Sequence, residues 1–117
     1  MGTFLHAIAI GDPQGQRWER VEALVGTRAS YTVLPATFLH RLGVTPIEQR
    51  PFELAGGKII NLPVGQTWVR VDGKSGIRIV VFSPEEVYIL GAETLSGFLL
   101  EVDPLGKRLV PVKGLLM

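Results

Sequence analysis

Residues 24–30 read LVGTRAS, and residues 31–35 continue as YTVLP. An apolar run stops at a turn made of Gly, Thr and Ser, and a second apolar run begins directly after it. Gly accepts backbone conformations that other residues avoid, and Ser and Thr readily hydrogen-bond to the backbone of a turn. The stretch therefore predicts two buried strands joined by a tight loop at residues 26–30.

The residues before this loop predict a hairpin that leads into it. Phe4 to Ile10 is rich in strand-forming residues, and GDPQG at residues 11–15 combines Pro and Gly in a strong turn signal. Gln16 to Val25 then returns as the second arm and becomes wholly apolar at its end. We expect this arm to enter the core just before the loop.

A short helix and a second hairpin are expected after the loop. Pro35 to Leu42 has apolar residues at helical spacing, and Gly43 can end the helix. Pro51 to Leu54 and Lys58 to Leu62 then read as hairpin arms. The expected tip consists of the residues Ala55, Gly56 and Gly57.

The last third of the chain continues the strand pattern. Gln66 to Val71 and Ile77 to Phe82 flank Asp-Gly at residues 72–73, a strong hairpin signal. Val87 to Leu90 reads as a buried strand, Ala92 to Leu100 as a helix, and Arg108 to Val112 as a terminal strand. About nine short strands and two short helices predict a single mainly-β domain over residues 1–117.

Composition excludes several classes of protein. With 46% apolar and 20% charged residues, the chain is typical of a folded globular domain. Its 12 Lys and Arg nearly balance 11 Asp and Glu, so no net field attracts nucleic acid or lipid. It has no cysteine, which excludes disulfides and thiolate metal sites. Without a signal-peptide pattern or a long apolar run, we expect a cytoplasmic protein.

The order of these features resembles the retropepsin-like (clan AA, retroviral-type) aspartic proteases, specifically their small bacterial branch. The resemblance covers nearly the whole chain. The stretches that carry it are ALV at 23–25, ASYTVLP at 29–35, LHRLGV at 39–44, LAGGK at 54–58, ILG at 89–91, EVDP at 101–104 and RLVPV at 108–112.

The resemblance implies a β-barrel protomer with one or two short helices that forms a homodimer about a two-fold axis. Each protomer would give one catalytic Asp from an Asp-Thr-Gly loop and a flap over a shared cleft for an extended peptide. In this chain the loop would be Gly26, Thr27, Arg28, Ala29 and Ser30, and the flap tip Ala55, Gly56 and Gly57. Ile89, Leu90 and Gly91 match the family's second signature. No cofactor or metal is implied.

The loop departs from the family at the two positions that matter most for catalysis. Gly26 stands where the catalytic Asp belongs, and Arg28 stands where the Gly of the motif belongs. The family's chemistry needs two carboxylates about 3 Å apart that share a proton. A symmetric dimer of this chain supplies none at that position. The sequence therefore predicts a family member without peptidase activity.

Other side chains give weaker candidates. Asp12, Asp72 and Asp103 lie in turn sequences, and Glu85 and Glu86 follow Ser-Pro in an expected surface loop. We interpret all five acids as turn or surface residues. Ser30 has no base nearby in the sequence, and two isolated histidines, His6 and His40, do not form a metal-site pattern.

Three hypotheses remain open. The first is an inactive homologue that binds an extended peptide or a partner as a dimer. The second is an active aspartic peptidase that works through a heterodimer with an intact paralogue, or through a substitute acid. The third is a swapped-hairpin DNA-binding regulator, which YTVLPATFLHRLGV at residues 31–44 also resembles. Only Arg28, Arg41 and Arg50 are basic around that segment, too few for several phosphate contacts, so no nucleic-acid partner is expected.

Overall fold

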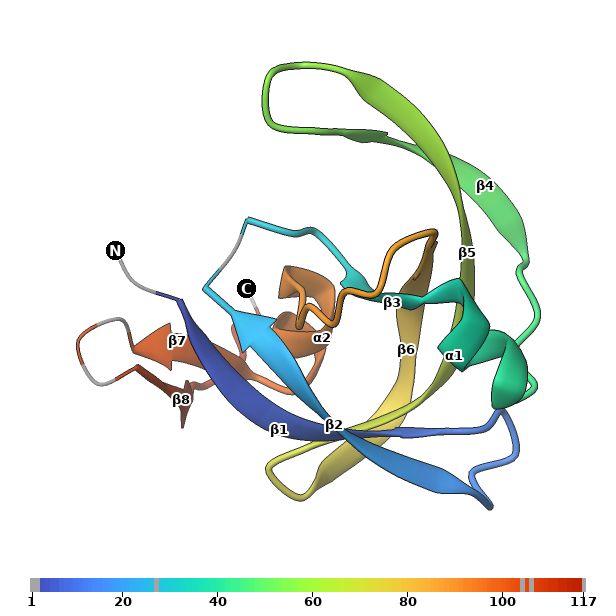
Figure 1. The fold of residues 1–117 in the computed structure, drawn as a ribbon. Helices are drawn as coiled ribbons and strands as arrows, with labels where there is room; N and C mark the ends of the chain where they lie inside the picture. Colours follow the sequence, from blue (N-terminus) through green and yellow to red (C-terminus); the bar gives the residue numbers. More distant parts are fainter. Residues whose placement is uncertain (1–2, 27, 104, 106, 117) are drawn as a thin grey trace.

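The computed structural model describes residues 3–26, 28–103, 105 and 107–116. A six-stranded sheet runs in the order β2-β1-β5-β6-β3, with β4 paired to β5, and β7 and β8 form a separate two-stranded sheet (Figure 1). The elements are β1 (Phe4–Gly11), β2 (Trp18–Val25), β3 (Thr32–Pro35), α1 (Ala36–Arg41), β4 (Glu48–Glu53), β5 (Ile59–Val71), β6 (Lys74–Ser83), α2 (Ala92–Gly97), β7 (Leu100–Asp103) and β8 (Arg108–Pro111). The chain is mainly β, as the sequence predicts.

The first hairpin forms as predicted, because the turn chemistry of its tip is local. β1 pairs antiparallel with β2 from Phe4 opposite Val25 to Gly11 opposite Trp18. The buried Asp12 carboxylate accepts the backbone N–H groups of Gln16 (2.7 Å) and Arg17 (2.9 Å). These hydrogen bonds, the one from Arg17 first, lower the pKa of Asp12. Asp12 is therefore a turn residue, as expected.

The strand β5 corrects one prediction. Two strands were expected, at residues 58–62 and 66–71, yet a single strand runs from Ile59 to Val71. It pairs with β4 through Pro63 and with β6 through Gly65. A Cβ on Gly65 would lie 2.9 Å from the carbonyl oxygen of Thr45, so glycine permits a close approach here. Pro63 and Gly65 are local strand breakers by type, but two neighbouring strands hold the chain extended through them.

Residues 88–90 join the two strands that flank the loop at residues 26–30. The Leu24 N–H donates to the Tyr88 carbonyl (2.8 Å), and the Leu90 N–H donates to the Leu24 carbonyl (3.0 Å). Val33 and Ile89 exchange two backbone hydrogen bonds of 2.9 Å. The predicted strand at residues 87–90 is therefore too long, because the ladder is limited to isolated bridges at Ile89.

Both helices are short and cover the core. The helix α1 begins after Pro35 and ends before Gly43, whose φ is 82°, close to the predicted bounds. The second helix was expected to reach Leu100, but α2 ends at Gly97. Leu99 adopts a positive φ of 55°, and its carbonyl accepts the Val112 N–H (2.9 Å), so the chain turns into β7 instead.

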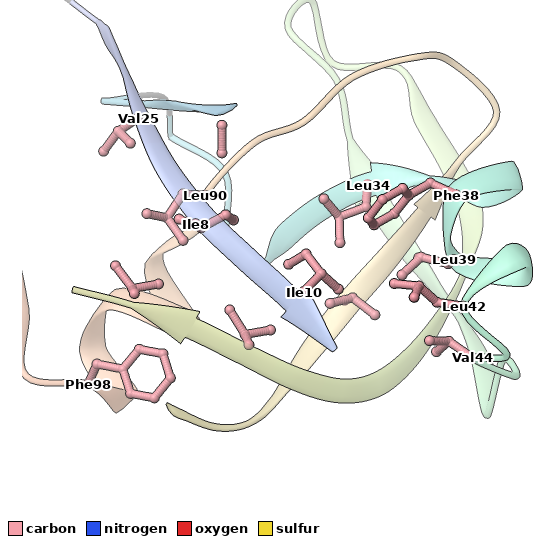
Figure 2. Close-up of a cluster of buried hydrophobic side chains, with 14 of the residues drawn as sticks. Ile8, Ile10, Val25, Leu34, Phe38, Leu39, Leu42, Val44, Leu90 and Phe98 are labelled. Carbon is pink, nitrogen blue, oxygen red and sulfur yellow. The ribbon is translucent and has the colours of Figure 1, made fainter. Parts of the chain in front are cut away.

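The core lies between the sheet and the two helices. Figure 2 shows the side chains of α1 gathered with Leu34 and Val44 at one end of the cluster, while Val25, Ile8 and Leu90 lie toward the other. Ile10, Leu34 and Leu39 are completely buried. Among the described residues, neither helix is long and apolar enough to cross a membrane.

The terminal strand is also one residue shorter than expected. It ends at Pro111 instead of Val112 and pairs with β7, whose first residue, Leu100, the sequence predicts as the end of the second helix. Pro104 and Gly106, in the connection between β7 and β8, lie outside the described residues.

Candidate functional site

A groove of about 670 Å³ lies between the loop that follows β2 and the β4–β5 hairpin. The loop contributes residues 28–31, the hairpin arms contribute residues 50–54 together with Ile60 and Leu62, and Val33 and Ile89 complete the wall beside the loop. The end of β6 and the turn after it contribute Val81, Ser83, Pro84 and Glu85. Segments that are far apart in the sequence thus meet at one groove, which we call the hairpin groove.

The structure places the loop residues as follows. Gly26 directly follows β2 and has a positive φ of 92°, which residues with a side chain rarely adopt. Arg28 and Ser30 are exposed, Ala29 is half-buried, and all three line the hairpin groove. Thr27 lies outside the described residues.

The second signature anchors this loop. The backbone N–H of Ala92 donates to the Ala29 carbonyl (3.0 Å), and that of Glu93 donates to the Ser30 carbonyl (2.9 Å). The Gly91 N–H donates to the buried Thr32 hydroxyl (3.1 Å), whose oxygen lies 2.6 Å from the Thr94 hydroxyl. These contacts fix the far side of the loop to the start of α2.

The three residues of the second signature have different surroundings. Ile89 lines the hairpin groove and Leu90 lies in the core. A Cβ on Gly91 would lie 2.1 Å from the carbonyl carbon of Tyr31, so glycine is the residue that lets the two backbones pack. The sequence names these three residues as one motif, and the tertiary structure places them in three different surroundings.

The predicted flap is the β4–β5 hairpin, which extends away from the rest of the sheet (Figure 1). Its tip is a turn in which Gly56 and Gly57 have φ values of 96° and 90°. The Leu54 N–H donates to the Lys58 carbonyl (2.7 Å). Ala55 and both glycines are exposed. The hairpin residues that line the groove come from its arms and Leu54, and the three tip residues that the sequence singles out do not line it.

A contact that the sequence did not reveal joins the hairpin to the loop. The Arg50 guanidinium donates to the Tyr31 hydroxyl (3.0 Å) and lies 5.6 Å from the centre of its ring. Phe52 meets the same ring edge-on at 6.1 Å. Glu48 pairs with Arg50 and is the main cause of the raised pKa of this guanidinium. The alternation of Arg50 and Phe52 places both on one face of a strand, but nothing local indicates Tyr31 as their partner.

This contact gives a testable prediction about the hairpin. Tyr31→Phe removes the hydroxyl that accepts from Arg50, so the hairpin should sample a wider range of positions over the groove. Because the sequence has no cysteine, Ala55→Cys and Ser96→Cys can carry a pair of spin labels. The distance distribution between them should broaden in the Tyr31→Phe variant. Tyr88→Phe is the matched control, because the Tyr88 hydroxyl contacts Glu86 instead (3.5 Å), and it should leave the distribution unchanged. Equal widths in all three proteins would contradict the prediction.

The acids fall into two groups. Asp72 has a φ of 52° at a turn and accepts from His6 (2.8 Å), while Asp103 accepts the Leu105 N–H (3.2 Å). Asp103 has the turn role that the sequence predicts, whereas Asp72 lies at a turn but its carboxylate contacts a residue distant in the sequence. Glu85 is exposed as expected, but it also lines the hairpin groove together with Glu53, which the sequence analysis did not single out.

The two histidines contact different residues. His6 contacts Asp72, and the exposed His40 lies 5.3 Å from the ring centre of Phe82. In residues 3–26, 28–103, 105 and 107–116, no group of three or more His, Asp and Glu side chains could hold a metal ion.

Comparisons with known proteins do not assign the chain to a family. No protein-family model matches the chain. A search of curated proteins likewise finds no significant match. The case for a function therefore rests on the residues of the chain and on the geometry of the hairpin groove.

Proposed function

We propose that the chain is a retropepsin-like aspartic protease homologue that has lost peptidase activity and binds an extended peptide as a homodimer. The observation that carries the proposal is the hairpin groove itself. Residues 28–31, the arms of the β4–β5 hairpin and Ile89 surround one space of about 670 Å³. The resemblance implies a peptide cleft at the loop and the flap, and Ile89 belongs to the second signature that it implies.

The walls of this groove suit an apolar, extended ligand. Val33, Phe52, Ile60, Leu62 and Val81 contribute apolar side chains from four different strands. A bound strand would place alternate side chains against such walls, and apolar contact would supply much of its affinity. A groove of this size falls in the range of known ligand sites.

The loss of catalysis follows from the loop. Gly26 has no side chain, and the exposed Arg28 brings a cation to the groove where the family motif has a glycine. The aspartic-protease mechanism needs a pair of carboxylates that share a proton. Neither protomer of a symmetric dimer would supply one from this loop, so binding without cleavage is the function that these residues support.

The dimer is supported by exposed apolar side chains near the chain ends. Leu115 is 93% exposed and Leu116 is 99% exposed, and the half-exposed Leu99 and Val112 lie near Leu115. The β7–β8 hairpin lies at one end of the molecule (Figure 1). Apolar surface of this kind is typical of protein–protein contacts. We propose that it packs against a second copy.

Sedimentation velocity with a fluorescent, unstructured casein fragment tests both parts of the proposal. The protein should sediment as a dimer, and intact fragment should move with it. Ile60→Asp places a charge in the groove and should weaken fragment binding at least about tenfold while the dimer persists. Ile59→Asp is the matched control, because this neighbour is 65% exposed and does not line the groove.

The same experiment separates the interface from the groove. Leu115→Asp combined with Leu116→Asp should raise the dimer dissociation constant at least about tenfold, because burial of a leucine contributes about 2 kcal/mol. A wild-type chain that stays monomeric at high micromolar concentration would contradict the dimer. A fragment that never sediments with the protein would contradict peptide binding.

A further inference from the structure

Two arginines line the hairpin groove, and they differ in whether a nearby carboxylate compensates their charge. Arg50 is paired with Glu48 and donates to the Tyr31 hydroxyl (3.0 Å), so its charge is already compensated within the protein. Arg28 is exposed at the groove. Within the part of the chain that the structure describes, its guanidinium has no ion pair. Arg28 is therefore the cation that remains available to a ligand.

The other residues that line the hairpin groove define what such a ligand would look like. Apolar side chains reach the groove from the hairpin through Phe52 and Ile60, and from the other wall through Val33 and Val81. A carboxylate opposite Arg28 would therefore be flanked by apolar side chains. A guanidinium binds a carboxylate through two parallel N–H donors, an interaction stronger and more directional than that of an ammonium.

The acidic side chains of the groove further limit the class of ligand that it would bind. Glu53 and Glu85 also line it, and neither forms an ion pair within the described residues. A ligand with many negative charges would meet these two carboxylates as well as Arg28. These two carboxylates would repel a run of acidic side chains, so the groove has a counter-ion for one acidic side chain, at Arg28, and not for an acidic run.

We propose that the hairpin groove selects peptide segments with one Asp or Glu side chain between apolar residues, and that Arg28 is the counter-ion of that side chain. This inference rests on the proposed peptide-binding function and names its ligand class. It also gives a role to Arg28, one of the two substitutions that separate this loop from the family motif. The bulky cation that is incompatible with the protease loop becomes the specificity determinant of a binding groove.

The test uses a panel of labelled peptides with both ends capped, so that their termini carry no charge. All share one apolar frame and differ only at the central position, which is Glu, Gln or Lys. Fluorescence anisotropy with the wild-type protein should show the Glu peptide binding about tenfold more tightly than the Gln peptide, with the Lys peptide weakest. The preference should shrink as salt is raised, because Arg28 is exposed.

Variants of the arginine give the decisive comparison. Arg28→Gln should bind the Glu and Gln peptides equally, and Arg28→Glu should prefer the Lys peptide. Arg20→Gln is the matched control, because Arg20 is exposed on β2 and does not line the groove. It should keep the wild-type preference. Circular dichroism of each variant confirms that the fold is retained.

The outcomes separate this inference from the proposed function. If no peptide of the panel binds, peptide binding fails and this inference fails with it. If the Glu and Gln peptides bind with equal affinity to the wild-type protein, the groove binds peptides but Arg28 does not select an acid. A Gln peptide with a free C-terminal carboxylate serves as a further arm. Tighter binding of that peptide than of the capped Glu peptide would assign Arg28 to a chain end and overturn the inference.

Discussion

The double variant Gly26→Asp, Arg28→Gly should cleave unstructured peptides at mildly acidic pH, whereas the wild-type chain should not cleave them. The two changes restore the Asp-Thr-Gly-Ala-Ser sequence in the loop at residues 26–30. In the proposed dimer they would place two carboxylates together at the axis, and mutual repulsion would raise the pKa of one of them. We expect weak, pepstatin-sensitive turnover at least about a hundredfold above that of the wild-type chain.

The structure explains why both changes are needed. Gly26 has a φ of 92°, so a side chain there is strained until the loop readjusts. Glycine at position 28 would give the loop the freedom to readjust, and it would also remove a guanidinium that could pair with the new carboxylate. Gly26→Asp alone should therefore stay inactive. The matched control is Gly26→Asn, Arg28→Gly, which keeps the shape of the side chain but cannot ionise.

Mass spectrometry of the products, with and without pepstatin, is the measurement. Cleavage by the wild-type chain that a single Asp→Asn or Glu→Gln change abolishes would overturn the proposed loss of catalysis and favour a substitute acid. Cleavage by the wild-type preparation that survives Ser30→Ala and every such change would come from a contaminant. Activity of a mixture with an intact homologue that exceeds the activity of that homologue alone would support the heterodimer hypothesis.

Gly91→Ala should destabilise the protein by about 3 kcal/mol or more, the largest stability effect that we expect from one methyl group. The added Cβ would lie 2.1 Å from the carbonyl carbon of Tyr31, 2.2 Å from its oxygen and 2.6 Å from the backbone nitrogen of Thr32. All three are backbone atoms, so no side-chain rotation can relieve the clash. The segment would have to move, and the hydrogen bonds that tie residues 88–90 to Leu24 and Val33 would weaken.

Urea unfolding followed by circular dichroism measures this effect. Gly114→Ala is the control, because a Cβ there would meet Leu99 at an ordinary contact distance of 3.4 Å. Its free energy of unfolding should stay within about 0.5 kcal/mol of the wild-type value. A Gly91→Ala protein as stable as the Gly114→Ala protein would show that the loop and the second signature are not packed as described.

The fold was predictable from the sequence wherever turns determine it. Asp-Gly at residues 72–73 predicts a two-residue hairpin turn, and both residues have positive φ values, 52° and 80°. Gly43 ends α1 in the same conformation, and Gly56 and Gly57 form the hairpin tip. Each of these turns depends on one or two residues that can adopt a positive φ, and such residues can be recognised by their type in the sequence.

The candidate site was predictable only as a set of segments. The loop, the β4–β5 hairpin and Ile89 do meet at one groove, and the order of the motifs along the chain indicated all three. The contact of Arg50 with Tyr31 was not predictable, and neither was the place of Glu85 in the groove wall. Such contacts join residues that are distant in sequence, and the type of each residue leaves many partners open.

The sequence by itself determined the positions of the turns and the mainly-β character, because turn chemistry and strand alternation act over a few residues. Only the tertiary structure decided where regular elements continue or end. β5 passes through Pro63 and Gly65 because β4 and β6 pair with it on both sides, and α2 ends at Gly97 because Leu99 turns the chain into β7. In both places, hydrogen bonds to segments distant in the sequence outweigh the local preference of the residues.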